Sequence, residues 1–220
     1  MKKLVSTLLM LVFAFSFSVC AFAANASPDD NEQYVLATGI YEGEALEACA
    51  EKLGYEMVTD DGYSLQSISV SYEENNDQNA VIKEPSVAPN ALGDHIGDVK
   101  KVASDRYFPD NPIASNWYDG PLTKLTKTYS RSVSGTYTCS ASVSASTVNA
   151  GLSFSVTDSV TESTTLERPA VSSSQKLNVK EFGVYDKYSF TLYGLLGDQK
   201  GTGYAYKPMG LYVTQAIYSK

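Results

Sequence analysis

The sequence predicts a mainly β protein, an antiparallel sheet or sandwich with a long Ser/Thr-rich β-hairpin and one short N-terminal helix. The first observation is a period of two, because every second residue from Thr126 to Ser146 is Ser or Thr. The second is that this pattern resumes from Ser153 to Thr165, one position out of phase. Strand side chains alternate between faces, so a period of two of this length predicts paired strands.

The first 23 residues predict a secretory signal peptide. Lys2 and Lys3 form a basic start, and an apolar stretch from Leu4 to Val19 follows. Small residues then precede the expected cleavage point after Ala23, as a secretory signal requires. We therefore expect a protein that is exported by the Sec route and is secreted or extracellular.

The charge balance argues against nucleic acid as a partner. The chain has a formal net charge of −8 at pH 7, and its acidic residues are concentrated before residue 110. Nucleic acids and anionic lipid surfaces both favour basic proteins. Two interpretations of the acidic half are open: it keeps an exported protein soluble, or it covers a mildly basic β-domain as a pro-region would.

Residues 24–79 are predicted to form an acidic segment with one helix and one strand. Residues 42–53 carry apolar side chains at helical spacing, and Gly54 supplies a C-terminal stop. Residues near 64–72 alternate between apolar and polar types, which predicts a strand. Residues 80–120 contain Pro, Gly, Asp and Asn without a period, which predicts an irregular linker or flap.

Residues 121–220 are predicted to form an all-β domain that begins with the long hairpin, residues 122–167. Apolar residues occupy odd positions in its first arm and even positions in its second arm. Paired residues must therefore have an odd sum, because any other register would place Ser and Thr opposite Val. We expect a loop at residues 148–151, with Ala145 opposite Phe154 or Leu152.

Long, charge-poor arms rich in Ser and Thr resemble the insertion region of aerolysin-like β-pore-forming toxins, including the epsilon-toxin and mosquitocidal-toxin branch. The resemblance covers residues 122–182, and no charged residue lies between Ser132 and Thr157. It implies arms that pack on the protein body and later insert into a membrane through residues 137–160. The chain also resembles small exported proteins of Gram-positive bacteria, which imply no activity.

The apolar face of the hairpin has two open roles, because it would face either lipid or the protein core. Cys139 lies on this face, and two alternatives are open for it. Cys49 and Cys139 either form a disulfide in an oxidising exterior or remain buried thiols. A disulfide would tie the N-terminal helix to the hairpin. The candidate membrane-facing or core residues are Tyr137, Cys139, Ala141, Val143, Ala145, Leu152, Phe154, Val156 and Val160.

The sequence does not predict an enzyme. His95 is the single histidine, and neither a nucleophile elbow, a zinc-protease helix nor a phosphate loop is present. Asp94 and Asp98 beside His95 are too scattered to predict a metal site. We expect no metal and no cofactor.

The alternative function is binding of a glycan or a protein at the cell surface, and self-association through the hairpin is a further possibility. Tyrosine combines a large contact area with a hydroxyl group, which suits a binding face. It is also a strong strand former, so the same residues are expected at the boundary of a core. The candidate binding face consists of Tyr185, Tyr188, Tyr193, Tyr204 and Tyr206.

Overall fold

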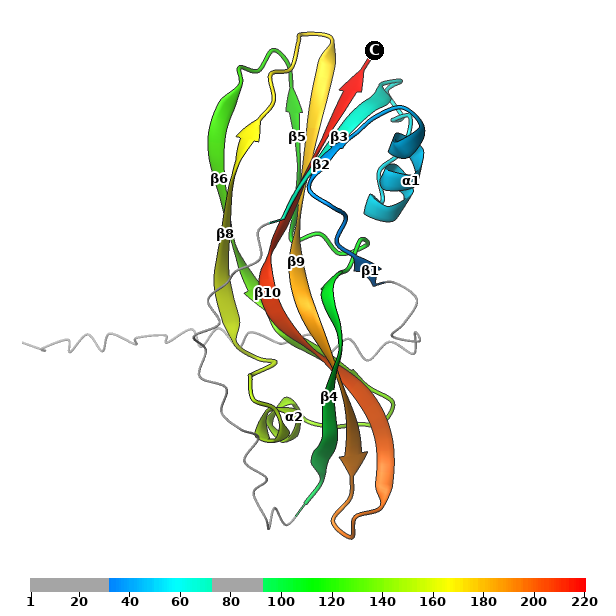
Figure 1. Ribbon diagram of the computed structural model, residues 1–220, viewed down its shortest axis with the longest axis vertical. Helices are drawn as coiled ribbons and strands as arrows, with labels where there is room; N and C mark the ends of the chain where they lie inside the picture. The colour runs from blue at the N-terminus through cyan, green and yellow to red at the C-terminus, as the bar shows by residue number, and fades with distance from the viewer. Residues whose placement is uncertain (1–31, 73–92) are drawn as a thin grey trace, which may run out of the picture.

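The computed structural model describes residues 32–72 and 93–220. In this part of the chain, an eight-stranded antiparallel sheet is joined by a second sheet of two strands. Two long strands, β9 (Gln175–Tyr193) and β10 (Gln199–Ser219), pair along their length in the centre of the larger sheet (Figure 1). The predicted mainly β, antiparallel fold is confirmed. The predicted signal peptide lies outside the described residues.

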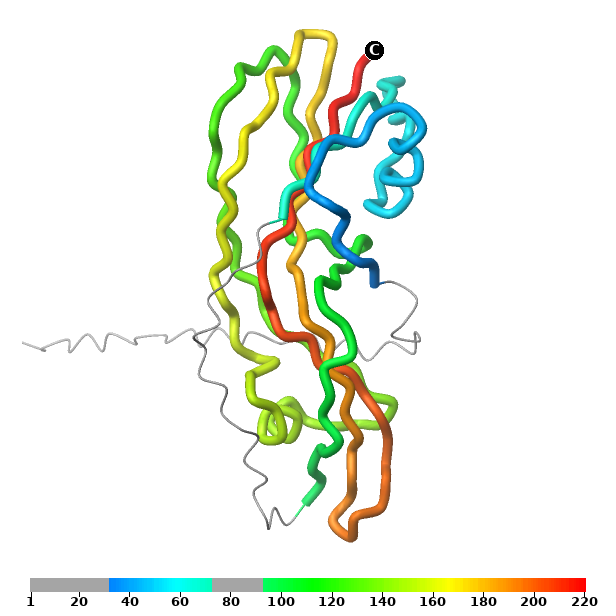
Figure 2. Tube along the Cα trace, in the orientation of Figure 1, coloured from blue at the N-terminus to red at the C-terminus, as the bar shows by residue number. Residues whose placement is uncertain are grey.

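Shorter strands complete the larger sheet on both sides of β9 and β10. Its order is β1-β4-β9-β10-β3-β2, while β5 pairs with β9 and β7 pairs with β10. The two central strands run from end to end of an elongated molecule (Figure 2). The other strands of this sheet are β1 (Gln33–Tyr34), β2 (Gly39–Tyr41), β3 (Ser64–Tyr72), β4 (His95–Tyr107), β5 (Ala114–Asp119) and β7 (Thr136–Cys139).

The second sheet is a ribbon of β6 (Leu125–Ser134) and β8 (Ser159–Arg168). Figure 1 shows this β6–β8 ribbon on one side of the central strands and helix α1 (Glu44–Leu53) on the other. A second helix, α2 (Ala145–Gly151), lies beside β4. The central strands thus carry the ribbon on one face and the N-terminal helix on the opposite face.

Helix α1 lies within the predicted range 42–53, and β3 has the predicted bounds of 64–72. The helix ends at Gly54, which has a φ of 63° and is therefore in the left-handed region that favours glycine. The buried side of α1, including Leu46 and Leu53, packs with Phe182 and Tyr212 of the central strands. Because β3 also pairs with β10, the N-terminal segment is part of the larger sheet.

The prediction of an irregular linker is wrong for residues 93–120, because these residues include β4 and β5. The pairing of β4 with β9 shifts register at three places, and Asp98 and Asp105 have positive φ values. Each such bulge adds a residue and reverses the side-chain alternation. The period of two is therefore absent from the sequence of β4. Residues 80–92 of the predicted linker lie outside the described residues.

Candidate functional site

The outer face of the β6–β8 ribbon is a double row of hydroxyl groups. Every second residue of β6 is an exposed Ser or Thr, and so is every second residue of β8 from Ser159 to Thr165, before Glu167 takes the last outward position. Hydroxyls of opposite residues hydrogen bond across the ribbon, at 2.8 Å for Thr128 and Thr165 and at 2.6 Å for Ser134 and Ser159. The predicted odd pairing sum is confirmed, since odd positions of β6 face even positions of β8.

The inner face of the ribbon packs on the central strands. Tyr129 and Val133 are buried in one hydrophobic cluster with Leu177 and Val179 of β9. Burial raises the pKa of Tyr129 to about 12, because it disfavours the phenolate. The folded ribbon therefore presents its hydroxyls to solvent and its other face to the core.

The predicted continuous hairpin of residues 122–167 is wrong between the two ribbon strands. Residues 135–158, here called the connecting segment, leave the ribbon, join the larger sheet through β7 and form α2 in the lower part of the view (Figure 1). Within it, β7 pairs with β10, and α2 includes all four residues of the loop expected at residues 148–151. Ser144 caps α2, since its Oγ accepts a hydrogen bond from Thr147 N at 3.1 Å.

The connecting segment covers one end of the sheet with apolar side chains. They pack on Phe190, Leu192 and Ala205 of the central strands, and Val148 of α2 is fully buried among them. Val160, the remaining candidate of the predicted apolar face, lies on β8 and is 43% exposed. The structure thus gathers eight of the nine candidates in one core cluster, namely Tyr137, Cys139, Ala141, Val143, Ala145, Leu152, Phe154 and Val156.

Of the two alternatives for Cys49 and Cys139, the structure shows the free thiols and not the disulfide. Cys49 lies in the hydrophobic cluster beneath α1, whereas Cys139 packs with the connecting segment. Burial raises the pKa of the Cys49 thiol to about 11. The helix and the connecting segment are therefore not covalently tied.

The five tyrosines proposed as a binding face do not form one surface. Tyr185 and Tyr188 are three residues apart in β9, so their side chains point to opposite faces of the sheet. Tyr206 is buried, and the ring of Tyr204 lies 3.9 Å from Lys187 Nζ in a cation–π contact. Tyr193 donates a hydrogen bond to Asp98. These tyrosines are engaged within the sheet.

His95 begins β4, where a loop was expected, and its ring stacks on Tyr193 with centroids 5.7 Å apart. Asp94 forms an ion pair with Lys200 at 2.6 Å. Within residues 32–72 and 93–220, no group of three side chains is arranged to hold a metal ion. The helices in the same ranges are all too short or too polar to cross a membrane.

Two features that were not predicted bear on function. The first is a backbone hydrogen bond in which Gly135 N donates to Asp158 O at 3.2 Å, one step beyond the last ribbon pair. The second is a cleft of about 250 Å³ between β5, β9 and the chain that follows α1. The cleft includes Trp117 and Asn178, which are far apart in the sequence and adjacent in the sheet. Only the single Trp of the sequence would have drawn attention to it.

The comparisons with known proteins add little to this geometry. No protein-family model matches the chain, and no curated protein matches its sequence. Among solved structures, the chain is similar to parasporin-2, a Bacillus thuringiensis toxin described as recognising cancer cells. The two are 12% identical, with a TM-score of 0.19, over 84% of this chain and 82% of the toxin.

Proposed function

We propose that this protein is a secreted, non-enzymatic pore former that extends the β6–β8 ribbon through the connecting segment into a membrane. The observation that carries the proposal is the hydrogen bond from Gly135 N to Asp158 O. It continues the register of the ribbon, in which Ser134 faces Ser159, into the connecting segment. The ribbon strands thereby set the register for the hairpin that would follow.

In this register, the two arms of the extended hairpin have a length that suits a bilayer. Thr136 would face Thr157 and each later pair would follow, leaving a two-residue turn at Ser146 and Thr147. Each arm then has about ten residues, and a strand needs about 9–11 residues to cross the hydrocarbon core. The turn would lie directly before the expected loop at 148–151.

The same register separates the side chains by type. Hydroxyl groups would share one face with Asn149 and Gly151, whereas every side chain of the other face is apolar. Asp158 would lie at the base of the arms beside Gly135, away from the bilayer centre where a charge costs most. The lipid-facing residues would be Tyr137, Cys139, Ala141, Val143, Ala145, Val148, Ala150, Leu152, Phe154 and Val156.

The folded position of the connecting segment supports the proposal. Its apolar side chains are covered by Phe190, Leu192 and Ala205, so they are withheld from water before insertion. Its attachment to the larger sheet is short, because β7 has four residues. It carries no charged residue from Gly135 to Thr157, so leaving the sheet breaks no ion pair of its own. Segments with few backbone contacts open at low free-energy cost.

A disulfide between the connecting segment and β10 tests the proposal. Ser140 N donates to Thr202 O at 2.9 Å, and Ser140 Oγ accepts a hydrogen bond from Thr202 N. The pair continues the antiparallel register of β7 with β10. Directly opposite residues of such strands have Cα atoms about 4.5–5.5 Å apart, within the range that a disulfide spans. Ser140→Cys with Thr202→Cys, made in a Cys139→Ser background, should block dye release from liposomes when oxidised and restore it when reduced.

The matched control is a disulfide within the ribbon. Thr128 and Thr165 are both exposed, and their hydroxyls are 2.8 Å apart, so Thr128→Cys with Thr165→Cys should leave release unchanged when oxidised. Equal release by the oxidised and reduced Ser140/Thr202 variant would contradict the proposal. Absence of release by the unmodified protein, before and after limited proteolysis, would also contradict it.

A further inference from the structure

The cleft beside α1 lies on the opposite face of β9 from the ribbon. Lys176, Asn178 and Lys180 alternate with residues that contact the ribbon, so they point toward α1 and the chain that follows it. In the register between β5 and β9, Trp117 faces Asn178 and Ser115 faces Lys180. Two neighbouring strands therefore place an aromatic ring, an amide, a hydroxyl and an ammonium group around one cavity.

Asn178 forms part of the buried floor of this cleft. Its side chain is 1% exposed, and no other described residue donates a hydrogen bond to its Oδ1. Because this oxygen has no appreciable accessible surface, a ligand in the cleft cannot reach it. The polar side chains open to a ligand are those of Ser115 and Lys180.

Trp117 provides an open aromatic surface at the rim of the same cleft. It is 51% exposed although it is the largest side chain of β5. Its ring is supported by Tyr218, with centroids 5.1 Å apart, and the Tyr218 hydroxyl donates to Glu56 O at 3.0 Å. The supporting ring is therefore fixed, and the exposed part of Trp117 is available for stacking.

Lys180 adds a donor without adding an open cationic site. Its Nζ donates to Gly54 O at 2.6 Å and to Leu53 O at 3.3 Å, and it lies 4.2 Å from the centre of the Tyr55 ring. Burial lowers the pKa of Lys180, because it disfavours the ammonium form. An ammonium group has three N–H donors, so one remains after the two carbonyls.

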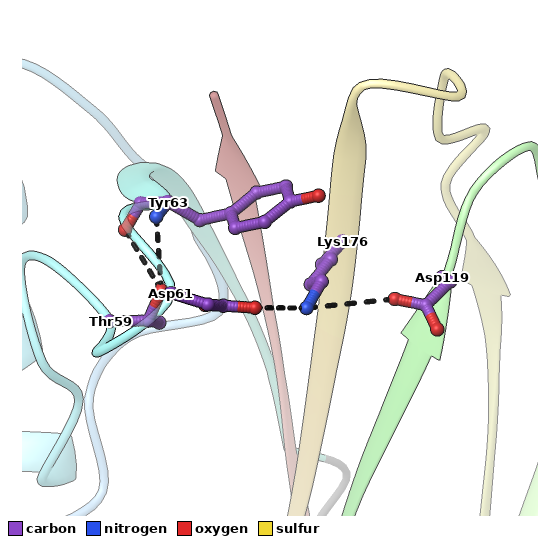
Figure 3. Close-up of polar contacts among 5 residues, drawn as sticks. All are labelled: Thr59, Asp61, Tyr63, Asp119 and Lys176. Carbon is purple, nitrogen blue, oxygen red and sulfur yellow. Dashed lines mark hydrogen bonds and ion pairs between the residues drawn. The ribbon is translucent and has the colours of Figure 1, made fainter.

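Lys176, a cation on the same face of β9, is already neutralised. Figure 3 shows Lys176 between Asp61 and Asp119, with the Asp119 oxygen 3.8 Å from Lys176 Nζ. Thr59, another lining residue, donates to Asp61 at 2.6 Å and thereby fixes this carboxylate. With two carboxylates around Lys176 and Glu56 at the cleft, the charges do not favour an anion.

We propose that this cleft binds a neutral sugar, with one pyranose ring stacked on Trp117 and ring hydroxyls hydrogen bonded to Ser115 Oγ and to the remaining N–H of Lys180. A pyranose combines an apolar C–H face with several hydroxyls, and the cleft matches both parts. A volume of about 250 Å³ suits a single ring rather than a long oligosaccharide. The site includes no residue of the connecting segment, so it stands whether or not that segment inserts into membranes.

Fluorescence of the single Trp tests this inference directly. Titration of the full protein with methyl glycosides of hexoses and N-acetylhexosamines should give a saturable change in Trp117 emission. We expect a Kd on the order of 1 mM, because one stacked ring with few hydrogen bonds gives only about 4 kcal/mol. Inorganic phosphate should cause no change. If the whole panel fails, or if phosphate competes with the sugar, the inference is wrong.

Two variants test whether the change in Trp117 emission arises from sugar binding in the cleft. Ser115→Leu removes the hydroxyl that lines the cleft and should weaken sugar binding at least about tenfold, which corresponds to roughly 1.4 kcal/mol. Asn116→Leu is the matched control, because Asn116 precedes Trp117 on the other face of β5 and should leave binding unchanged. Trp117→Ala should abolish binding in calorimetry. Unchanged binding in either cleft variant, with the fold intact by circular dichroism, would overturn the inference.

Discussion

The Arg131 guanidinium on β6 reaches the Glu181 carboxylate on β9, with 2.8 Å between Arg131 Nη2 and Glu181 Oε1. Glu181 is 1% exposed, and its second oxygen has no hydrogen-bond partner among the described residues. The ribbon is therefore attached to the central sheet by a charge pair as well as by its apolar side chains.

Replacing Arg131 with Met should destabilise the protein by leaving the Glu181 charge buried and unpaired. Breaking a fully buried pair costs about 3–5 kcal/mol. We expect about 2 kcal/mol, because the Arg131 side chain remains 39% exposed and water screens the pair. Urea unfolding measures the change. Adding Glu181→Gln should recover most of the loss, whereas a double variant as unstable as Arg131→Met would contradict the pairing.

The effect of an added aspartate on dye release should depend on which face of the extended hairpin carries it. Val143→Asp would put a carboxylate toward lipid in the extended hairpin, at about 1–2 kcal/mol for each subunit. Summed over an oligomer, this should reduce dye release by more than about tenfold. Ser142→Asp, on the hydroxyl face, should keep release and favour cations. Equal effects of the two variants would exclude the face assignment.

Disulfide trapping on liposomes should reveal the register of the extended hairpin. In a Cys139→Ser background, cysteines at Ser140 and Ser153 would face each other if the ribbon register continues. Cysteines at Ser140 and Thr157 would face each other only in a register shifted by four. Electrophoresis without reductant should show bond formation in the first pair alone after liposomes are added. Trapping of the second pair instead would refute the register.

Stability should fall as the pH rises above about 10. Burial raises the pKa of Tyr129 and of Tyr185 to about 12, whereas an unfolded tyrosine ionises near pH 10. Between these values the folded protein binds more protons than the unfolded chain, so the free energy of unfolding decreases with pH. Thermal unfolding followed by tyrosinate absorbance should show both the lower Tm and a step in ionisation. A constant Tm through this range would contradict the assignment.

Local patterns predicted the elements whose periodicity is uninterrupted. Helix α1 has four buried side chains at helical spacing and a glycine at its end, and β3 alternates throughout. The inward and outward faces of β6 and β8 also follow from the alternation of Ser and Thr. In each case the pattern and the packing require the same structure.

The connecting segment could not be predicted from its pattern, because its alternation continues that of the ribbon. Packing on Phe190 and Leu192 instead stabilises a short strand and a helix, and the Ser144 cap adds a local preference for that helix. The cleft could not be predicted either, since Trp117 and Asn178 become neighbours only through the pairing of β5 with β9.

The alternation within β9 has a consequence for how this protein can change. Leu177, Val179 and Glu181 support the ribbon, whereas Asn178 and Lys180 form the cleft on the other face. Substitutions at odd and at even positions of this stretch therefore form two separable classes, and each can be varied while the other is preserved. A single inserted residue would exchange the two faces and remove both sites at once.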